Sequence, residues 1–241
     1  MFVILISSCG ISAMEQEQKL SMIERKATAC ALSQLSFLDN EKILHIGPRR
    51  EEIIKKKAVG AQVYCIDTDT LSMLQNSIQG YDKILSFVCW DVAKDPQESF
   101  NNSARLLKNS GQFCAVIPYH KSPYLNIHYQ TLTNDKWKNF YNKGIEVDIY
   151  GSKKMKEFLI KAGLGANVAC VVIKKPFIFK TRELFAGWIQ SCPEQLDGID
   201  LEHRAAFVND VVNNYLQQYP LEQDDSVQLY LPYMIVSGYK S

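Results

Sequence analysis

The sequence predicts an α/β protein built on a doubly wound, mostly parallel sheet. Short apolar runs of strand length alternate with amphipathic or charged stretches of helical length along most of the 241 residues. The clearest example is residues 41–67, where the apolar run 43–46 ends at Gly47, a charged amphipathic segment follows, and a second apolar run closes on Asp67. Parallel strands require a crossover of this kind, so the alternation favours a parallel sheet with helices on both faces.

Composition and charge argue against several classes of function. The chain has 27 Lys and Arg against 26 Asp and Glu, a formal net charge of +1, which argues against nucleic acid as the main partner. Its seven cysteines are scattered without a Cys-x-x-Cys pair. We therefore expect reduced thiols, with no disulfide framework and no metal site, and a cytoplasmic location. The length suits one large domain.

The N-terminal segment, MFVILISSCG, is apolar but too short for a membrane span, which needs roughly 20 residues. Residues 6–9 resemble a lipoprotein cleavage site, which leaves a lipoprotein or secreted protein as the alternative location. However, no Lys or Arg precedes the apolar run, as a signal peptide requires. We interpret residues 1–13 as a leader or an extra strand, and residues 14–241 as a single domain with a helical elaboration at about 180–220.

In the first half of the chain, apolar spacing and turn residues predict each element. Apolar residues three and four positions apart predict a helix before the first strand, and Glu–Lys pairs four residues apart support the helix after Gly47. A later helix ends before Gly80, and Lys108–Gly111 has the composition of a helix C-terminus. The expected elements are helices 15–35, 68–77 and 96–107 and strands 43–46, 63–66, 84–89 and 113–117.

In the second half, we expect residues 118–149 to form a segment rich in Tyr, Asn, Lys and His at the carboxyl edge of a strand, where ligands bind in such sheets. Gly163 and Gly165 end the next helix, Thr181 is a candidate N-cap, and 201–219 carries its apolar residues on one helical face. The expected elements are helices 152–162, 181–190 and 201–219 and strands 168–173, 177–179 and 227–237, the last bent at Pro232.

Candidate ligand residues follow the predicted strands. Gly47 ends the first strand and Asp67 the second. In nucleotide-binding α/β folds, such a glycine lets a ligand approach the backbone and such an acid binds a ribose hydroxyl. Trp137 lies in the segment after the fourth strand, where His120 and His128 could serve an acidic ligand. The alternative for the acid and the histidines is that they are solvent-exposed turn residues without a ligand.

Three stretches carry a resemblance to a known family. They are ILHIGPRREE with CIDTD, then YDKILSFVCWDVAKDPQESFNNSARLLKNSGQFCAVIP, and finally PFIFKTRELFAGWIQSCPEQLDGIDLEHRAAFVNDVVNNYLQQYP with VQLYLPYMIVSGYK. Together they resemble the class I S-adenosylmethionine-dependent methyltransferases, in particular the group of trans-aconitate and juvenile hormone acid methyltransferases. The resemblance covers roughly residues 20–241.

The resemblance implies a Rossmann-like methyltransferase fold with strand order 3-2-1-4-5-7-6 and one antiparallel strand. It implies S-adenosylmethionine bound over the first two strands, at Gly47 and Asp67, and a substrate pocket near Trp90, to which we add His120 and Trp137 as candidates. The substrate would be a small carboxylic acid methylated on oxygen. Because a carboxylate is already nucleophilic, this transfer depends mainly on alignment and requires no catalytic residue.

The turn after the first strand departs from the family pattern. Where the family has Asp-x-Gly-x-Gly-x-Gly, this chain has His45, Gly47, Arg49 and Glu51, so only the first glycine is kept. Any side chain at position 49 intrudes where the backbone must approach the donor. The positive charge of Arg49 is also unfavourable beside a sulfonium. The donor-binding motif is therefore degenerate.

A second departure is the short segment between Asp67 and Asp82, which has room for one helix but not for the family's edge strand three as well. We expect that strand to be missing, and an adenine contact to be missing with it. The edge of strand 63–66 would then be exposed, so a homodimer or a partner bound through this edge is a hypothesis.

Two functions follow from these observations. The favoured one is a degenerate methyltransferase, which keeps the fold as a binding or scaffold module for a small acidic molecule or a protein partner. The alternative is an active S-adenosylmethionine-dependent methyltransferase that acts on a small carboxylic acid. The turn at 47–51 distinguishes them, because the donor can bind only if the side chain of Arg49 points out of the adenosine site.

Overall fold

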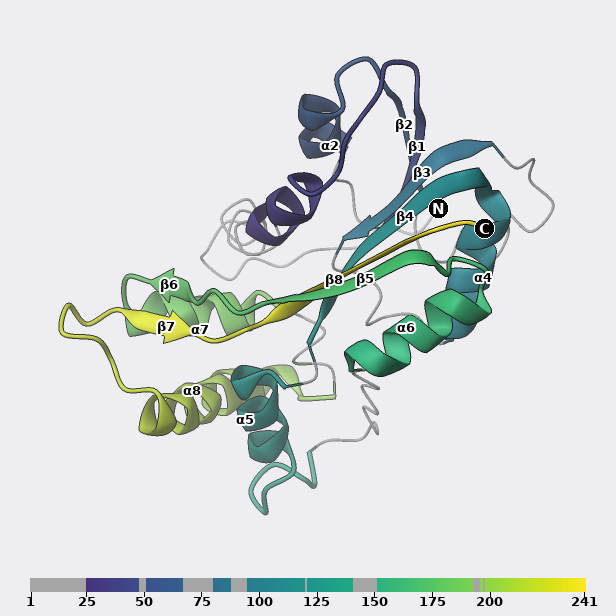
Figure 1. Ribbon diagram of the computed structural model, residues 1–241. Helices are drawn as coiled ribbons and strands as arrows, with labels where there is room; N and C mark the ends of the chain where they lie inside the picture. Colours follow the sequence, from purple (N-terminus) through teal and green to yellow (C-terminus); the bar gives the residue numbers. More distant parts are fainter. Residues whose placement is uncertain are drawn as a thin grey trace, which may run out of the picture. The chain divides into compact units, whose positions relative to one another are not determined.

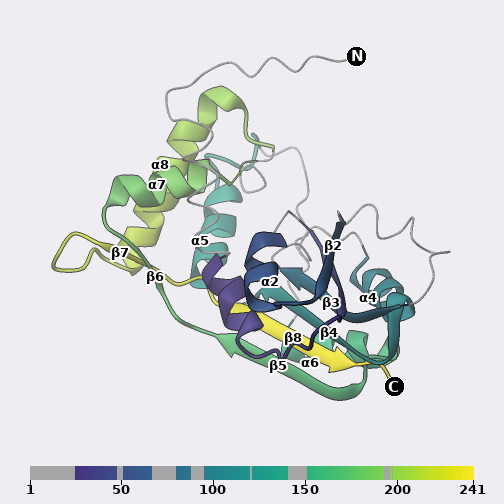
Figure 2. The ribbon, with the colours of Figure 1, turned by 90° about the horizontal axis from the view of Figure 1, so that it is seen from above.

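A computed structural model describes residues 25–47, 51–66, 80–87, 95–119, 121–140, 151–192, 196 and 198–241. Its main feature is a sheet whose described strands follow the order β2-β1-β3-β4-β8-β5, with helices on both faces (Figures 1 and 2). The fold is therefore the mixed α/β fold with a mostly parallel central sheet that the sequence predicts.

The strands of this sheet are β1 (Lys42–Ile46), β2 (Gln62–Ile66), β3 (Tyr81–Phe87), β4 (Leu107–Pro118), β8 (Tyr233–Tyr239) and β5 (Ala166–Ile173). β1 pairs in parallel with β2 and β3, and β3 with β4, whereas β8 is antiparallel to both β4 and β5. This agrees with the expected family order for the strands described. Residues 67–79, where the edge strand was expected to be missing, lie outside the described residues.

The helices are α2 (Glu51–Lys57), α4 (Pro96–Leu106), α5 (Pro123–Leu132), α6 (Ser152–Lys161), α7 (Arg182–Gln190) and α8 (Leu201–Gln218). Residues 25–32 are also helical. Successive β1 side chains face opposite sides of the sheet: Leu44 packs in a core cluster with residues of α4 and α6, and Ile43 in a cluster with residues of helix 25–32 and α2. Two apolar faces, each covered by helices, make the sheet doubly wound.

The expected helix end at Lys108–Gly111 is instead part of a strand. β4 begins at Leu107, directly after α4, and its pairing with β3 contains a register shift. The Ser110 N–H donates a 3.1 Å hydrogen bond to the carbonyl of Lys240, and the Lys240 N–H donates a 2.9 Å bond to the carbonyl of Gly111. Backbone partners from the far end of the chain thus override the turn-like composition of this segment.

The segment 118–149, for which the sequence analysis expected no helix, contains helix α5. Pro123 occupies its first position, where the fixed φ of proline suits a helix, and the Ser122 hydroxyl accepts a 3.3 Å hydrogen bond from the Leu125 N–H. The sequence prediction missed this helix because its buried face mixes apolar and polar side chains. The buried members of that face are Tyr124, Ile127, His128 and Thr131.

The expected last strand, 227–237, is two strands. β7 (Val227–Leu229) pairs with β6 (Phe177–Phe179) in a separate two-stranded sheet, and β8 begins at Tyr233 in the main sheet. Pro232 lies directly before β8 and has no N–H to offer a neighbouring strand. The predicted bend is therefore a break between two sheets.

The two C-terminal helices form as predicted. The Thr181 hydroxyl accepts a 3.3 Å hydrogen bond from the Leu184 N–H and caps α7. α8 buries one apolar stripe, as expected from the apolar spacing of 201–219, and its members include Phe207, Val211, Val212 and Tyr215.

The chain divides into two compact units. The larger, here called the sheet unit, comprises the described residues of 24–126, 145–177 and 229–241. The smaller, the helical unit, comprises those of 127–144 and 178–228. We keep as a proposal that 14–241 form one methyltransferase-like domain with a helical elaboration; residues 1–13 lie outside the described residues.

Candidate functional site

The turn after β1 has the backbone shape expected of a ligand-binding glycine. Gly47 is buried and has a φ of 122°, a conformation that side-chain-bearing residues rarely adopt. Its N–H donates a 2.8 Å hydrogen bond to the carbonyl of Ile66, the last residue of β2. The ends of β1 and β2 are thus tied together at the predicted donor-binding position.

The parallel strands β1 to β4 end at one edge of the sheet. Ile46 is in register with both Ile66 and Ser86. Three of the predicted site residues, Asp67, Trp90 and His120, follow β2, β3 and β4 in the chain, and all three lie outside the described residues. Their assignments to the cofactor and substrate sites stay predictions.

His45, which stands at the acidic position of the family's turn, points into the core. Its side chain is fully buried, its ring lies 5.6 Å from that of Phe87, and neither ring nitrogen has a hydrogen-bond partner. Burial lowers the pKa of His45 to about 4, so the imidazole is neutral at physiological pH. This side chain supplies no charge to a ligand.

Ser86 is a polar residue at this edge that the sequence analysis did not select. It is fully buried near the end of β3, and its hydroxyl donates a 3.1 Å hydrogen bond to the carbonyl of Ile46. The bond holds the end of β1 against β3, next to the Gly47 turn. The only sequence signal for it is a serine inside the otherwise apolar run ILSFVC.

Trp137, the other predicted substrate-pocket residue, is described and belongs to the helical unit. Its side chain is 2% exposed, and its indole N–H donates a 2.7 Å hydrogen bond to Oδ2 of Asp210 on α8. Phe207 lies edge-on to the indole, with ring centroids 5.3 Å apart, and edge-on to His128 at 5.4 Å. The indole N–H is thus already bound inside the protein. The role of Trp137 in a substrate pocket stays a prediction.

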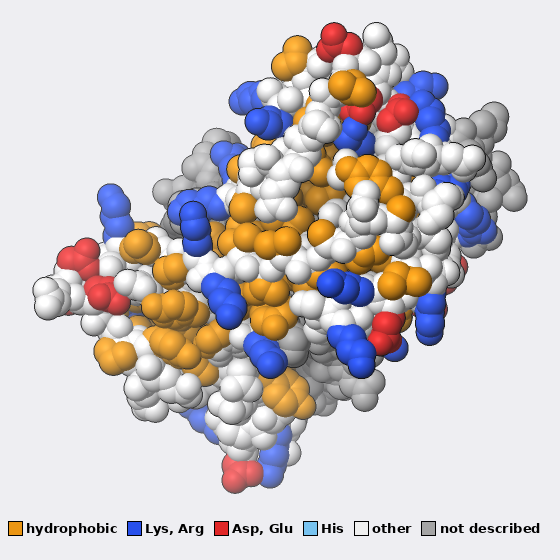
Figure 3. Space-filling view, in the orientation of Figure 1, with side chains coloured by type: hydrophobic (Ala, Val, Ile, Leu, Met, Phe, Trp, Pro, Cys, Tyr) orange, Lys and Arg blue, Asp and Glu red, His pale blue; other side chains and the backbone are white. Residues whose placement is uncertain are grey.

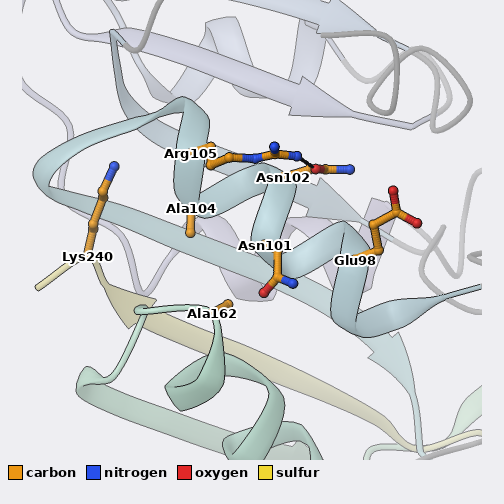
Figure 4. A pocket seen from close by; sticks show the side chains of 7 residues that line it. All are labelled: Glu98, Asn101, Asn102, Ala104, Arg105, Ala162 and Lys240. Atoms are coloured by element: carbon orange, nitrogen blue, oxygen red, sulfur yellow. Dashed lines mark hydrogen bonds between the residues drawn. The ribbon is translucent and has the colours of Figure 1, made fainter. Parts of the chain in front are cut away.

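A hollow of about 460 Å³ lies in the sheet unit at the edge where β4 begins, opposite the Gly47 edge (Figure 4). Lys240 Nζ donates a 2.8 Å hydrogen bond to the carbonyl of Leu107, the C-cap of α4, and Arg105 in the last turn of α4 donates to the Asn102 side chain. These cations complement a negative helix end rather than a bound anion. The lining residues are Glu98, Asn101, Asn102, Ala104, Arg105, Ala162 and Lys240.

Within the described ranges, no group of three or more His, Cys, Asp or Glu side chains is placed to hold a metal ion. Among the same residues, no helix is long and apolar enough to cross a membrane.

Comparison with known proteins relates the chain to methyltransferases. No protein-family profile matches it. The chain is 22% identical over 218 residues to protein 235L of Invertebrate iridescent virus 6, which is named as a methyltransferase; the match covers 76% of this chain and 77% of that protein.

Two crystal structures resemble the fold of this chain. One is a Bacillus halodurans protein named as a methyltransferase, with 13% identity, a TM-score of 0.54, and coverage of 90% of this chain and 97% of the other. The second is the YcgJ protein of Bacillus subtilis, with 12% identity, a TM-score of 0.54, and coverage of 90% and 98%. Together with the strand order, these similarities show that the chain has the class I S-adenosylmethionine-dependent methyltransferase fold.

Proposed function

We propose that this protein is a degenerate methyltransferase, which keeps the fold of small-molecule carboxylate O-methyltransferases as a binding or scaffold module. The main support for the proposal is that His45 is neutral, fully buried and without hydrogen-bond partners. A family member has a carboxylate at this position, whereas here a neutral, fully buried ring has both nitrogens without a partner. A donor with a sulfonium and an amino group gains nothing from such a ring.

The sequence of the turn supports the same proposal. Gly47 keeps the backbone shape of the first family glycine, but Arg49 and Glu51 replace the next two. A glycine is used where a ligand must lie against the backbone, since a Cβ fills that space. The residues around the turn therefore fit S-adenosylmethionine poorly.

The proposed ligand is a small acidic molecule or a protein partner, by analogy with the carboxylate substrates of the family that the sequence resembles. The proposed location is the cytoplasm. Five of the seven cysteines lie in the described part of the chain, and Cys30, Cys114 and Cys170 among them are free thiols. Free thiols at these positions suit a reducing compartment.

An active S-adenosylmethionine-dependent methyltransferase for a small carboxylic acid is the second candidate. The observation that favours it is the retained turn geometry, with Gly47 at a φ of 122° and its hydrogen bond to Ile66. In that case the donor would lie over the ends of β1 and β2, and Arg49 would point away from it.

Calorimetric titration with S-adenosylmethionine and with S-adenosylhomocysteine tests the proposal. We expect no heat and no thermal shift at millimolar ligand for the natural sequence. Replacing both residues, Arg49→Gly with Glu51→Gly, should create measurable binding if their side chains block the donor. The matched control is Glu52→Gly with Lys56→Gly, which places two glycines at exposed positions of α2 and should create none. Micromolar binding by the natural sequence would overturn the proposal in favour of the active enzyme.

A further inference from the structure

The outermost strand of the main sheet, β5, has an open edge. β5 pairs with β8 on one side, and in the part of the chain that the structure describes no strand pairs with its other side, here called the β5 edge. Figure 2 shows β5 along one margin of the sheet and β2 at the opposite margin. An open edge presents unpaired backbone N–H and C=O groups, which are a template for another strand.

The strand itself is uncharged and has one exposed apolar side chain. A register shift interrupts the start of β5, which leaves residues 169–173 as a regular segment without a charged residue or a proline. Cys170 faces the side of the sheet that α6 covers, and Ile173 faces the side of helix 25–32. Because side chains alternate along a strand, Val171 shares the side of Ile173, and it is 41% exposed. A strand added here would gain backbone hydrogen bonds and an apolar neighbour.

The chain around this strand is basic. Residues 151–177, which include α6 and β5, contain six lysines and one acid, whereas the whole chain has a formal net charge of only +1. The one acid, Glu157, lies 3.8 Å from Lys154, so its charge is balanced on α6 itself. In the space-filling view, Lys and Arg side chains are interspersed with hydrophobic ones on this side of the molecule (Figure 3). The six lysines, all exposed, are Lys153, Lys154, Lys156, Lys161, Lys174 and Lys175.

Two of these lysines, Lys153 and Lys156, form a stripe along the side of α6 next to β5. Burial raises the pKa of the Cys170 thiol on β5 and the Lys156 ammonium opposes that rise, so Lys156 lies near the strand. Lys153 is one helical turn before Lys156, and Ile160, 60% exposed, is one turn after it. Ile160 adjoins the start of β5, because a Cβ on Gly165 would lie 3.7 Å from its side chain. Among the described residues, neither lysine of the stripe forms an ion pair.

Further cations lie where β5 ends. Lys174 and Lys175 follow the strand directly. Lys26 of helix 25–32, on the other face of the sheet, has its ammonium 5.9 Å from the ring centroid of Phe177. Positive charge therefore surrounds the β5 edge from both faces and from the strand end. Two such edges brought together would repel each other, whereas an acidic strand would be attracted.

We propose that the β5 edge binds an extended acidic segment of another protein, which adds a strand to the main sheet. Side chains of the added strand alternate between the two faces. Its acidic residues lie on the α6 face, next to Lys153 and Lys156, and its apolar residues lie on the other face, beside Val171. A nucleic acid or an anionic lipid would meet the same lysines but would leave the backbone groups of the edge unpaired.

Fluorescence anisotropy tests the proposal with a labelled peptide, Glu-Val-Glu-Val-Glu-Val-Glu, titrated with the full chain. We expect a dissociation constant in the micromolar range at low salt. The peptide Glu-Pro-Glu-Pro-Glu-Pro-Glu keeps every carboxylate but cannot pair as a strand, so it should bind at least about tenfold more weakly. A Lys-Val peptide of the same length keeps the strand pattern with the opposite charge, and should not bind.

Substitutions on α6 test the role of the two lysines. Lys153→Glu with Lys156→Glu should weaken binding of the Glu-Val peptide at least about tenfold. The matched control is Lys56→Glu with Lys57→Glu, which makes the same change of net charge at exposed positions of α2. It should weaken binding less than about threefold, because charges far from the edge are screened by salt. Equal weakening by both double variants would overturn the proposal, since the peptide would then respond to net charge alone.

Hydrogen exchange locates the bound peptide without any substitution. The Glu-Val peptide should slow the exchange of amides in residues 169–173 and leave β2 unchanged. Protection of β2 instead of β5 would overturn the proposal, as would equally tight binding of the Glu-Pro peptide. The same holds if the Glu-Val peptide does not bind while phosphatidylserine vesicles or single-stranded DNA bind through Lys153 and Lys156, since the lysines would then serve a lipid or nucleic-acid surface. None of these measurements depends on whether a methyl donor binds.

Discussion

The backbone N–H of Gly47 and the carbonyl of Ile66 are joined by a 2.8 Å hydrogen bond, which ties the ends of β1 and β2 at the turn where the methyltransferase fold binds its donor. Gly47 itself adopts a φ of 122°, which directs the chain away from β1 immediately after the strand. The turn therefore has a structural role that holds whether or not a donor binds.

Replacing Gly47 by alanine should destabilise the sheet unit. A Cβ is strained at this φ, so we expect Gly47→Ala to lower the free energy of unfolding by about 1–3 kcal/mol. Urea denaturation followed by circular dichroism measures the change. The control is Gly80→Ala in the same unit, where φ is not positive and an added Cβ meets no atom within 4 Å. Equal stability of the two variants would contradict the backbone argument.

His45 should make the protein sensitive to mild acid. Its pKa is about 4 in the folded state against 6.5 when unfolded, so the unfolded chain binds the proton more readily between these values. The contribution to stability is complete above pH 6.5 and is lost as the pH falls to about 4. The shift corresponds to about 3 kcal/mol.

A variant isolates the effect of His45. His45→Leu removes both unpaired ring nitrogens, so we expect higher stability at pH 7 and a weaker loss between pH 6.5 and 4 than in the natural sequence. Urea denaturation at several pH values gives both quantities. Ile43→Val, at a fully buried apolar position of the same strand, serves as the control and should change stability by a similar amount at every pH. Parallel profiles for His45→Leu and the natural sequence would contradict the assignment.

The bond between Trp137 and Asp210 should stabilise the helical unit. Trp137→Phe removes the 2.7 Å hydrogen bond and leaves the carboxylate with one partner fewer, so we expect a loss of about 1–3 kcal/mol. A double-mutant cycle with Asp210→Asn measures the coupling, monitored by hydrogen exchange of α8. Lys136→Met removes the ion pair of Asp210 with a lysine side chain that is 60% exposed, together with the contact of that ammonium with the Trp137 ring, and should cost about 1 kcal/mol or less.

Because Lys83 and Glu41 form a buried ion pair, we expect the losses of stability caused by substituting each of them not to be additive. The two side chains are 8% and 11% exposed, where β3 and β1 begin. Lys83→Met leaves the Glu41 carboxylate buried without its cation, and should cost about 3–5 kcal/mol. Adding Glu41→Gln should restore much of the loss, as measured by urea denaturation. The control is Lys108→Met, whose ion pair with Asp82 has a 48% exposed lysine side chain. Additive losses in the double variant would contradict the argument.

Local sequence patterns predicted most elements of the fold. Thr181 identified the start of α7, and the apolar stripe of α8 marked its buried face, because caps and helical periodicity act within a few residues. The strand status of Lys108–Gly111 could not be predicted in this way. Its hydrogen bonds go to Lys240, whose distance along the chain leaves no local signal.

In the candidate site, too, only the features that depend on the local sequence could be predicted. Gly47 could be predicted, because a glycine directly after an apolar strand has a conformational role that depends on its own φ. The partner of Trp137 could not be predicted, because Asp210 belongs to helix α8, 73 positions away. Asp67, Trp90 and His120 stay predictions, since each follows the last described residues of its strand.

The sequence by itself determined the alternation of strands and helices, and with it the parallel, doubly wound sheet, because period and turn chemistry are local properties of the chain. The protonation and hydrogen bonding of His45, in contrast, were decided by the tertiary structure alone. The sequence shows a histidine in an apolar run, but its neutrality and its unpaired nitrogens come from packing between the sheet and the helices that cover it. Desolvation depends on every surrounding element at once, so no local pattern encodes it.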